Sequence, residues 1–130
     1  MLWIKWKKMI VKDTFSEFLM RYDWNYFITC RTPYKIHTMT VRTWAKNLMQ
    51  NSKKIDRLFF VSERDKGDFH NLHVHMLLGT NMQMTYREVR KGLGNISVGD
   101  YQAIYDCEYV CAYVSKHIGN NVDYDLFIKS

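Results

Sequence analysis

The chain has 130 residues, of which 47% are hydrophobic and 25% are charged, with one proline and six glycines. That length predicts a single domain, residues 1–130, with a core of its own, and excludes two such domains. Lys and Arg outnumber Asp and Glu by 19 to 13, and the resulting formal charge of +6 favours a polyanionic partner through phosphate contacts.

The cysteines and the hydropathy of the chain predict the cellular compartment of the protein. Cys30, Cys107 and Cys111 are odd in number and lack the spacing of a disulfide scaffold, which predicts reduced thiols in a cytosolic compartment. The chain has no apolar run long enough to cross a membrane, and its first residues lack a signal-peptide pattern. We therefore expect a soluble, cytoplasmic protein with no membrane partner.

The first part of the chain alternates helix and strand signals. Residues 14–22 predict a helix, because Thr14 can cap it and apolar residues follow at helical spacing. Residues 25–32 are β-rich and end before Pro33, which predicts a strand. Residues 40–52 return to helical spacing.

Residues 57–79 predict an antiparallel hairpin. An apolar run is followed by turn residues and then by a segment, 72–78, in which apolar and polar side chains alternate. Successive side chains of a strand point to opposite faces, so His73 and His75 project together from the polar face. The hairpin would also bring Glu63 alongside the two histidines.

His73, His75 and Glu63 form a candidate metal site. Two imidazoles and one carboxylate would leave open positions for water or substrate, and such a set suits zinc, manganese or magnesium. His70 and Asp65, in or beside the turn, are alternatives to Glu63, although a strand residue is better fixed than a turn residue. Alternatively, both histidines are solvent-exposed residues of an ordinary amphipathic strand.

The last third of the chain adds two helices and extended segments. Residues 85–91 predict a short helix that is stopped by Gly92 and Gly94, and extended pieces follow within residues 95–105. Asp106 is a natural N-cap for a final helix over residues 107–118. The order helix, strand, helix, strand, strand, helix, strand, helix predicts an α+β fold with an antiparallel sheet.

Tyr109 and Tyr113 are four residues apart in this final helix, so their hydroxyls would share one face. A phenol is a poor nucleophile at its ordinary pKa of about 10 and needs a nearby cation or metal. Lys116, three residues beyond Tyr113, is on the same side and can supply the charge. The alternative is that both rings only pack against the sheet.

Three segments together resemble the motifs of the HUH endonucleases. Residues 26–32, Tyr-Phe-Ile-Thr-Cys-Arg-Thr, resemble the first motif, and His73-Val74-His75 resembles the paired-histidine metal motif. Tyr113-Val114-Ser115-Lys116 resembles the Tyr-x-x-Lys nucleophile motif. Their order and separation are those of a Rep protein, the initiator of rolling-circle replication in plasmids and small viruses.

The resemblance implies a metal-dependent, site-specific single-stranded DNA endonuclease and strand transferase. By that resemblance, His73, His75 and Glu63 hold Mn²⁺ or Mg²⁺ at the scissile phosphate. Tyr113 would attack this phosphate and leave a 3′-hydroxyl and a 5′-phosphotyrosyl link, and the reverse reaction would rejoin the strand. The implied fold is α+β, a central antiparallel sheet of about five strands flanked by helices, as in ferredoxin-like and RNA-recognition folds.

The resemblance also implies further roles and partners. Thr29, Arg31 and Lys116 are expected to contact DNA. Tyr109 is either a second nucleophile, as in gene A proteins of some single-stranded DNA phages, or a packing or DNA-stacking residue. Expected partners are single-stranded DNA at a replication origin and host replication proteins including a helicase, because no Gly-x-x-x-x-Gly-Lys loop is present. A homodimer would supply a second tyrosine even if Tyr109 is structural.

Two other functions use the same residues differently. A single-strand transposase or a conjugative relaxase would keep the chemistry, but Lys116 and the late position of Tyr113 favour a Rep. A non-catalytic nucleic-acid-binding module would keep the basic charge and the aromatic residues and leave the histidines and Tyr113 incidental.

Overall fold

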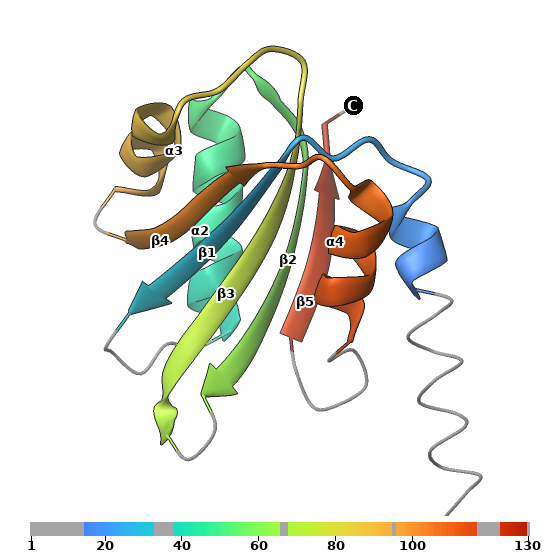
Figure 1. Cartoon of the computed structure of the whole chain (residues 1–130). Coiled ribbons are helices and arrows are strands. Elements are labelled where there is room, and N and C mark those ends of the chain that lie inside the picture. Colours follow the sequence, from blue (N-terminus) through green and yellow to red (C-terminus); the bar gives the residue numbers. More distant parts are fainter. Residues whose placement is uncertain (1–14, 33–37, 66–67, 95, 117–122, 130) are drawn as a thin grey trace, which may run out of the picture.

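The computed structural model describes residues 15–32, 38–65, 68–94, 96–116 and 123–129, which Figure 1 draws in colour. Side chains are described for all of these except residues 32, 38–40, 63–65, 68–72 and 97. A helical segment at residues 15–19 comes first. The elements that follow are β1 (Tyr26–Thr32), α2 (Thr38–Asn51), β2 (Ile55–Asp65), β3 (Asp68–Thr80), α3 (Tyr86–Leu93), β4 (Ser97–Ala103), α4 (Cys107–Ser115) and β5 (Asp123–Ile128).

The strands form one five-stranded antiparallel sheet in the order β4-β1-β3-β2-β5 (Figure 1). The predicted α+β class and antiparallel sheet are therefore confirmed. β2 and β3 pair as the predicted hairpin, with Glu63 opposite His73. Because β3 is the central strand, it carries His73 and His75 into the middle of the sheet.

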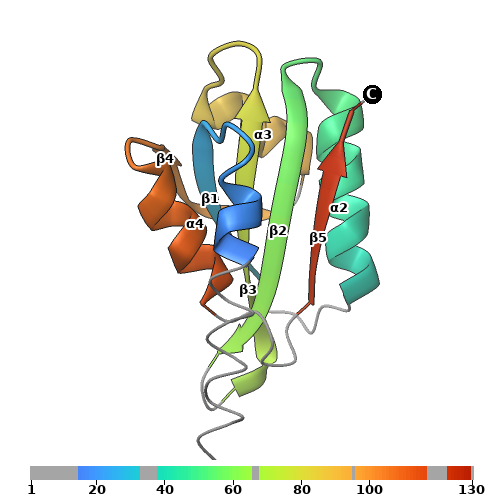
Figure 2. The ribbon, with the colours of Figure 1, turned by 90° about the vertical axis from the view of Figure 1, so that its right-hand side faces the viewer.

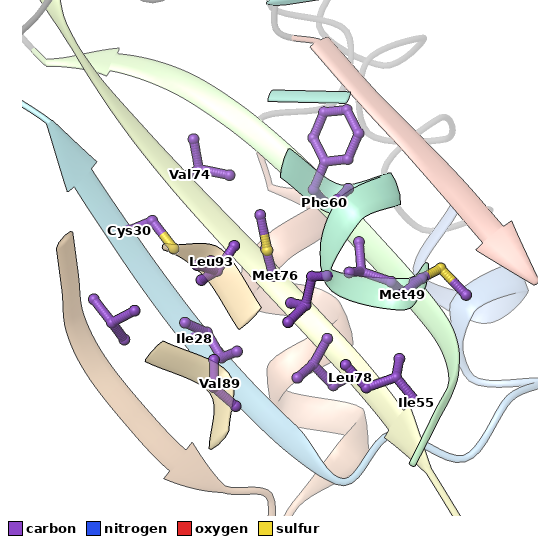
Figure 3. Close-up of a cluster of buried hydrophobic side chains, with 14 of the residues drawn as sticks. Ile28, Cys30, Met49, Ile55, Phe60, Val74, Met76, Leu78, Val89 and Leu93 are labelled. Carbon is purple, nitrogen blue, oxygen red and sulfur yellow. The ribbon is translucent and has the colours of Figure 1, made fainter. Parts of the chain in front are cut away.

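Helices cover both faces of the sheet, as Figure 2 shows with α2 on one side and α4 with residues 15–19 on the other. Figure 3 shows the core beneath α2 and α3, where Val74, Met76 and Leu78 of β3 are buried as the alternating pattern predicts. A second core, beneath α4, consists of the buried residues Leu19, Trp24, Phe59, Val61, Leu77, Cys111 and Val114.

This second core changes the expected environment of the histidines. The sequence places them on the polar face of a half-buried strand, but α4 covers that face, and His75 is only 7% exposed. The alternative of two solvent-exposed histidines is therefore wrong for His75. Its burial depends on a helix that begins more than thirty positions later in the chain.

The observed helix ends differ from the predicted ones by a few residues. α3 continues through Gly92, the first of its two predicted stops, to Leu93, and Gly94, the second, is its C-cap at φ 67°. A Cβ at Gly92 would lie 2.5 Å from Leu48 Cδ1, so glycine here permits close packing of α3 on α2 instead of ending the helix. α4 begins at the predicted cap, where the Asp106 side chain accepts a hydrogen bond from the backbone N–H of Tyr109, but it ends at Ser115.

The two edge strands depart from the sequence analysis. The extended pieces within residues 95–105 form the single strand β4, whose pairing with β1 shifts at Gly99, because Val98 pairs with Cys30 and Asp100 with Thr29. The element order read from the sequence lacked β5. This strand is only half-buried, so its apolar and polar residues do not alternate clearly in the sequence, and its pairing with β2 is long-range.

The cysteines are free thiols, as predicted. They differ in burial, and we expect them to differ in reactivity for that reason. Burial raises the pKa of Cys30 to about 12, and burial together with the nearby Cys107 raises the pKa of Cys111 to about 12. Because the thiolate is the reactive form, Cys107, which is half-buried, is expected to react first with a thiol reagent in the native protein. Peptide mapping after timed alkylation measures the order, and equally fast labelling of Cys30 would contradict it.

Within the residues described, no helix is long and apolar enough to cross a membrane.

Candidate functional site

A pocket on the α4 face of the sheet brings the predicted site residues together. Its volume is about 410 Å³, and β1, β3, β4 and α4 all contribute to its wall. We call it the histidine–tyrosine pocket; it is lined by Thr29, Arg31, His73, His75, Gly99, Asp100 and Tyr113. Strand pairing explains the assembly, because Thr29 is opposite His75 on one side and opposite Asp100 on the other.

Three neighbours fix the His75 ring. Thr29 Oγ1 lies 3.1 Å from His75 Nδ1. Phe27 stacks on the imidazole at a centroid distance of 5.5 Å and an interplanar angle of 19°, and Tyr113 meets it edge-on at 5.5 Å and 76°. A ring held by two aromatic neighbours and at one nitrogen has a defined orientation in the pocket.

This arrangement fits a metal ligand. When Nδ1 carries the proton and donates it to the Thr29 hydroxyl, Nε2 keeps its lone pair, as in ligating histidines oriented by an outer hydrogen bond. The His73 ring lies on the same face, with its centroid 6.4 Å from that of His75. The pocket thus offers two neighbouring imidazoles to one divalent ion.

Glu63, the predicted third ligand, is on the strand beside His73. Glu63 is opposite His73 in the hairpin register, as predicted, but its side chain, like those of Asp65 and His70, lies outside the described ones. Among the side chains that are described, no three from histidine, cysteine, aspartate and glutamate form a group able to hold a metal. The N, N, O ligand set therefore stays a prediction.

Tyr113 and Lys116 meet at the end of α4. Tyr113 is half-buried between the sheet and solvent, and the Lys116 Nζ lies 4.0 Å from the centroid of its ring. Lys116 is the C-cap of the helix, where the helix dipole favours a positive charge. The cation and the phenol therefore share one site, as the spacing of the motif predicts.

Tyr109 lies on the same face of α4, as predicted from the i, i+4 spacing. Its ring stacks on that of Tyr113 at a centroid distance of 6.4 Å and an interplanar angle of 25°. Its side chain is 67% exposed, so it contributes little to the core. The packing alternative is therefore weak for Tyr109.

Thr29, Arg31 and Asp100 all line the pocket, but each offers a different chemical group to it. Thr29 faces His75, whereas Arg31 is exposed and suited to a phosphate. Asp100 is a carboxylate of this pocket that sequence reasoning missed. No local pattern marks it, because the pairing of β4 with β1 places it there.

We expect Thr29→Val to weaken metal binding about 10- to 100-fold, the usual cost of losing an outer hydrogen bond to a ligating histidine. Valine keeps the shape of the side chain but removes the partner of His75 Nδ1. Calorimetric titration with Mn²⁺ measures the affinity, and Thr43→Val, an exposed change on α2, is the matched control. Equal affinity in both variants would contradict the positioning role of Thr29.

The fold is similar to that of a solved viral protein. The crystal structure of the hypothetical protein ORF119 from Sulfolobus islandicus rod-shaped virus 1 matches with a TM-score of 0.53 and 24% sequence identity. The match covers 80% of this chain and 90% of that one. At this identity the likeness concerns the fold alone.

Comparison with curated proteins finds no match. The model of the family described as "Virus, 117-like" matches residues 21–124, a range that includes β1, the β2–β3 hairpin and α4. That range takes in most of the chain and all of the described lining of the histidine–tyrosine pocket. The chain belongs to the 117-like family of viral proteins.

Proposed function

We propose that this viral protein is a metal-dependent, site-specific single-stranded DNA nickase and strand transferase of the HUH type, which initiates rolling-circle replication as a Rep protein. One observation carries the proposal: Tyr113 meets His75 edge-on at 5.5 Å, with the Lys116 ammonium 4.0 Å from the tyrosine ring. The proposed nucleophile and a pair of imidazoles, from distant parts of the chain, thus line one pocket, and the Lys116 ammonium lies against the tyrosine ring.

In the proposed reaction, Tyr113 Oη attacks the phosphorus of one phosphodiester. The bond from phosphorus to the 3′-oxygen breaks, this oxygen takes up a proton, and the phenol loses its proton to solvent. A 5′-phosphotyrosyl link remains on Tyr113. Attack by another 3′-hydroxyl reverses these steps and rejoins the strand without a nucleotide triphosphate.

The surrounding residues assist the attack. Mn²⁺ or Mg²⁺ bound by His73, His75 and Glu63 would polarise the scissile phosphate and offset the charge that develops on it. Lys116 adds a second positive charge beside the phenol. Arg31, exposed at the pocket, would hold a flanking phosphate, and the formal charge of +6 favours DNA overall.

Tyr109 has two roles compatible with its position. Its exposed ring, stacked on Tyr113, is near enough to serve as a second nucleophile in a two-tyrosine cycle. Alternatively it stacks on DNA, and the second nucleophile comes from another copy of the chain in a homodimer. Either cycle needs a host helicase to unwind the template.

Covalent capture tests the proposal. The wild-type protein is incubated with a pool of randomised single-stranded oligonucleotides and Mn²⁺, and denaturing electrophoresis isolates any adduct. We expect mass spectrometry to find DNA on Tyr113, and sequencing of that DNA to define the nick site. Absence of an adduct with linear and hairpin-containing pools, while Mn²⁺ is bound, would overturn the proposal.

A non-catalytic single-stranded DNA-binding module is the second candidate. Exposed aromatic residues favour it, since Tyr105 is 97% and Tyr109 67% exposed, and such rings stack on bases with or without cleavage. Binding without an adduct would support this reading. A transposase or relaxase would form the same adduct, so the recovered nick site, compared with the viral origin and with element ends, distinguishes these from a Rep.

A further inference from the structure

A second pocket adjoins the histidine–tyrosine pocket and shares Tyr113 and Asp100 with it. Its volume is about 350 Å³. We call it the aromatic pocket; it is lined by Phe27, Asp100, Gln102, Ala103, Ile104, Tyr105, Asp106, Tyr109, Val110 and Tyr113. The two pockets therefore form one continuous surface with Tyr113 at the junction.

The walls of the aromatic pocket suit a flat ring. Tyr109 and Tyr113 stand nearly parallel on α4, and Phe27 meets Tyr113 edge-on at 5.9 Å. Tyr109 and Tyr105 expose most of their rings to solvent instead of packing in the core. Stacking on such rings is how proteins bind the bases of single-stranded nucleic acid.

One edge of the pocket is polar and rich in acceptors. Gln102 Nε2 donates to both oxygens of Asp100, at 3.3 and 3.1 Å. This uses the amide as a donor and leaves the Gln102 carbonyl and the outer lone pairs of Asp100 as acceptors. The edge therefore favours a base with an amino group, because carboxylate and amide oxygens accept from cytosine N4 or adenine N6.

We infer that the aromatic pocket holds the base next to the scissile phosphate and prefers cytosine or adenine to thymine there. Because the two pockets share Tyr113 and Asp100, a strand whose phosphate reaches Tyr113 Oη in one pocket can place a neighbouring nucleotide in the other. The position of this base next to a cleaved phosphate rests on the proposed function, whereas the base preference rests on the aromatic pocket alone.

The test measures binding in a protein that cannot form the adduct through its proposed nucleophile. Tyr113→Phe protein is titrated by fluorescence anisotropy into labelled oligonucleotides of deoxycytidine, deoxyadenosine or thymidine. Adding Tyr109→Ala is expected to weaken binding to deoxycytidine about 5- to 150-fold, whereas Tyr109→Phe, which keeps the ring, retains it. Tyr124→Ala, on β5 at the opposite edge of the sheet, is the control and leaves affinity unchanged.

The polar edge has a separate test. The protein is expected to bind deoxycytidine and deoxyadenosine oligonucleotides more tightly than thymidine ones, and Asp100→Asn, which adds a donor, is expected to remove that preference. A base preference that survives the substitution would overturn the role of Asp100. Thermal melting confirms that each variant is folded.

The outcomes separate this inference from the proposed function. If Tyr109→Ala binds as tightly as Tyr124→Ala while the wild-type protein forms its adduct, the aromatic pocket is not a base site and the nickase stands. If the wild-type protein forms no adduct but Tyr109→Ala weakens binding and the base preference holds, the base site stands and the nickase fails.

Discussion

Tyr113→Phe is expected to abolish the covalent DNA adduct and to lower cleavage at least about a thousand-fold, because removal of a nucleophile eliminates the covalent route. The phenylalanine ring keeps the edge-on contact with His75 and the contact with the Lys116 ammonium, so the fold and DNA binding should be retained. Gel analysis of a labelled oligonucleotide carrying the captured nick site measures cleavage, and anisotropy measures binding.

Two matched variants give this result its meaning. Tyr124→Phe removes a hydroxyl on β5 that is outside the lining of both pockets, and this variant should cleave like the wild-type protein. Tyr109→Phe tests the two-tyrosine cycle, since a single turnover should survive while strand transfer to a second nucleophile is lost. Normal cleavage by Tyr113→Phe would show that another residue is the nucleophile.

His73→Ala and His75→Asn are expected to remove Mn²⁺-dependent cleavage, with a loss of metal affinity greater than the roughly 10- to 100-fold typical of an outer-shell change. Each substitution removes one of the two neighbouring imidazoles of the histidine–tyrosine pocket. Asparagine is chosen at position 75 because the side chain is 7% exposed and an alanine there would leave a gap beside Phe27 and Tyr113.

Calorimetry with Mn²⁺ and cleavage across a range of Mn²⁺ concentrations measure the two effects separately. Thr43→Val again serves as the control. Cleavage by the wild-type protein should stop on addition of a chelator and return with excess Mn²⁺. Full Mn²⁺ affinity in both histidine variants would place the metal elsewhere, and the role of Tyr113 would then need another source of charge.

Local features of the sequence were predicted well because short-range physics decides them. The β2–β3 hairpin follows from its turn residues and from side chains that alternate at the period of a strand. The stacking of Tyr109 on Tyr113 follows from helical spacing, and the start of α4 follows from the capping carboxylate of Asp106.

Weaker local signals explain the errors. Gly92 and Gly94 were both expected to stop α3. Gly94 does so as the C-cap, whereas Gly92 lies inside the helix, where the absence of a side chain allows close packing against Leu48. β5 was missed because its acidic residues do not read as a strand. In the fold, Asp123 and Asp125 pair with Arg42 of α2, which stabilises this edge.

By itself, therefore, the sequence determined the hairpin that carries His73 and His75 and the helix that carries Tyr113, since turns, caps and periodicity act over a few residues. Only the tertiary structure decided that α4 would cover the histidine face and that β4 would bring Asp100 beside it. Those contacts join segments far apart in the chain. They depend on which apolar faces bury one another, and no local pattern encodes that choice.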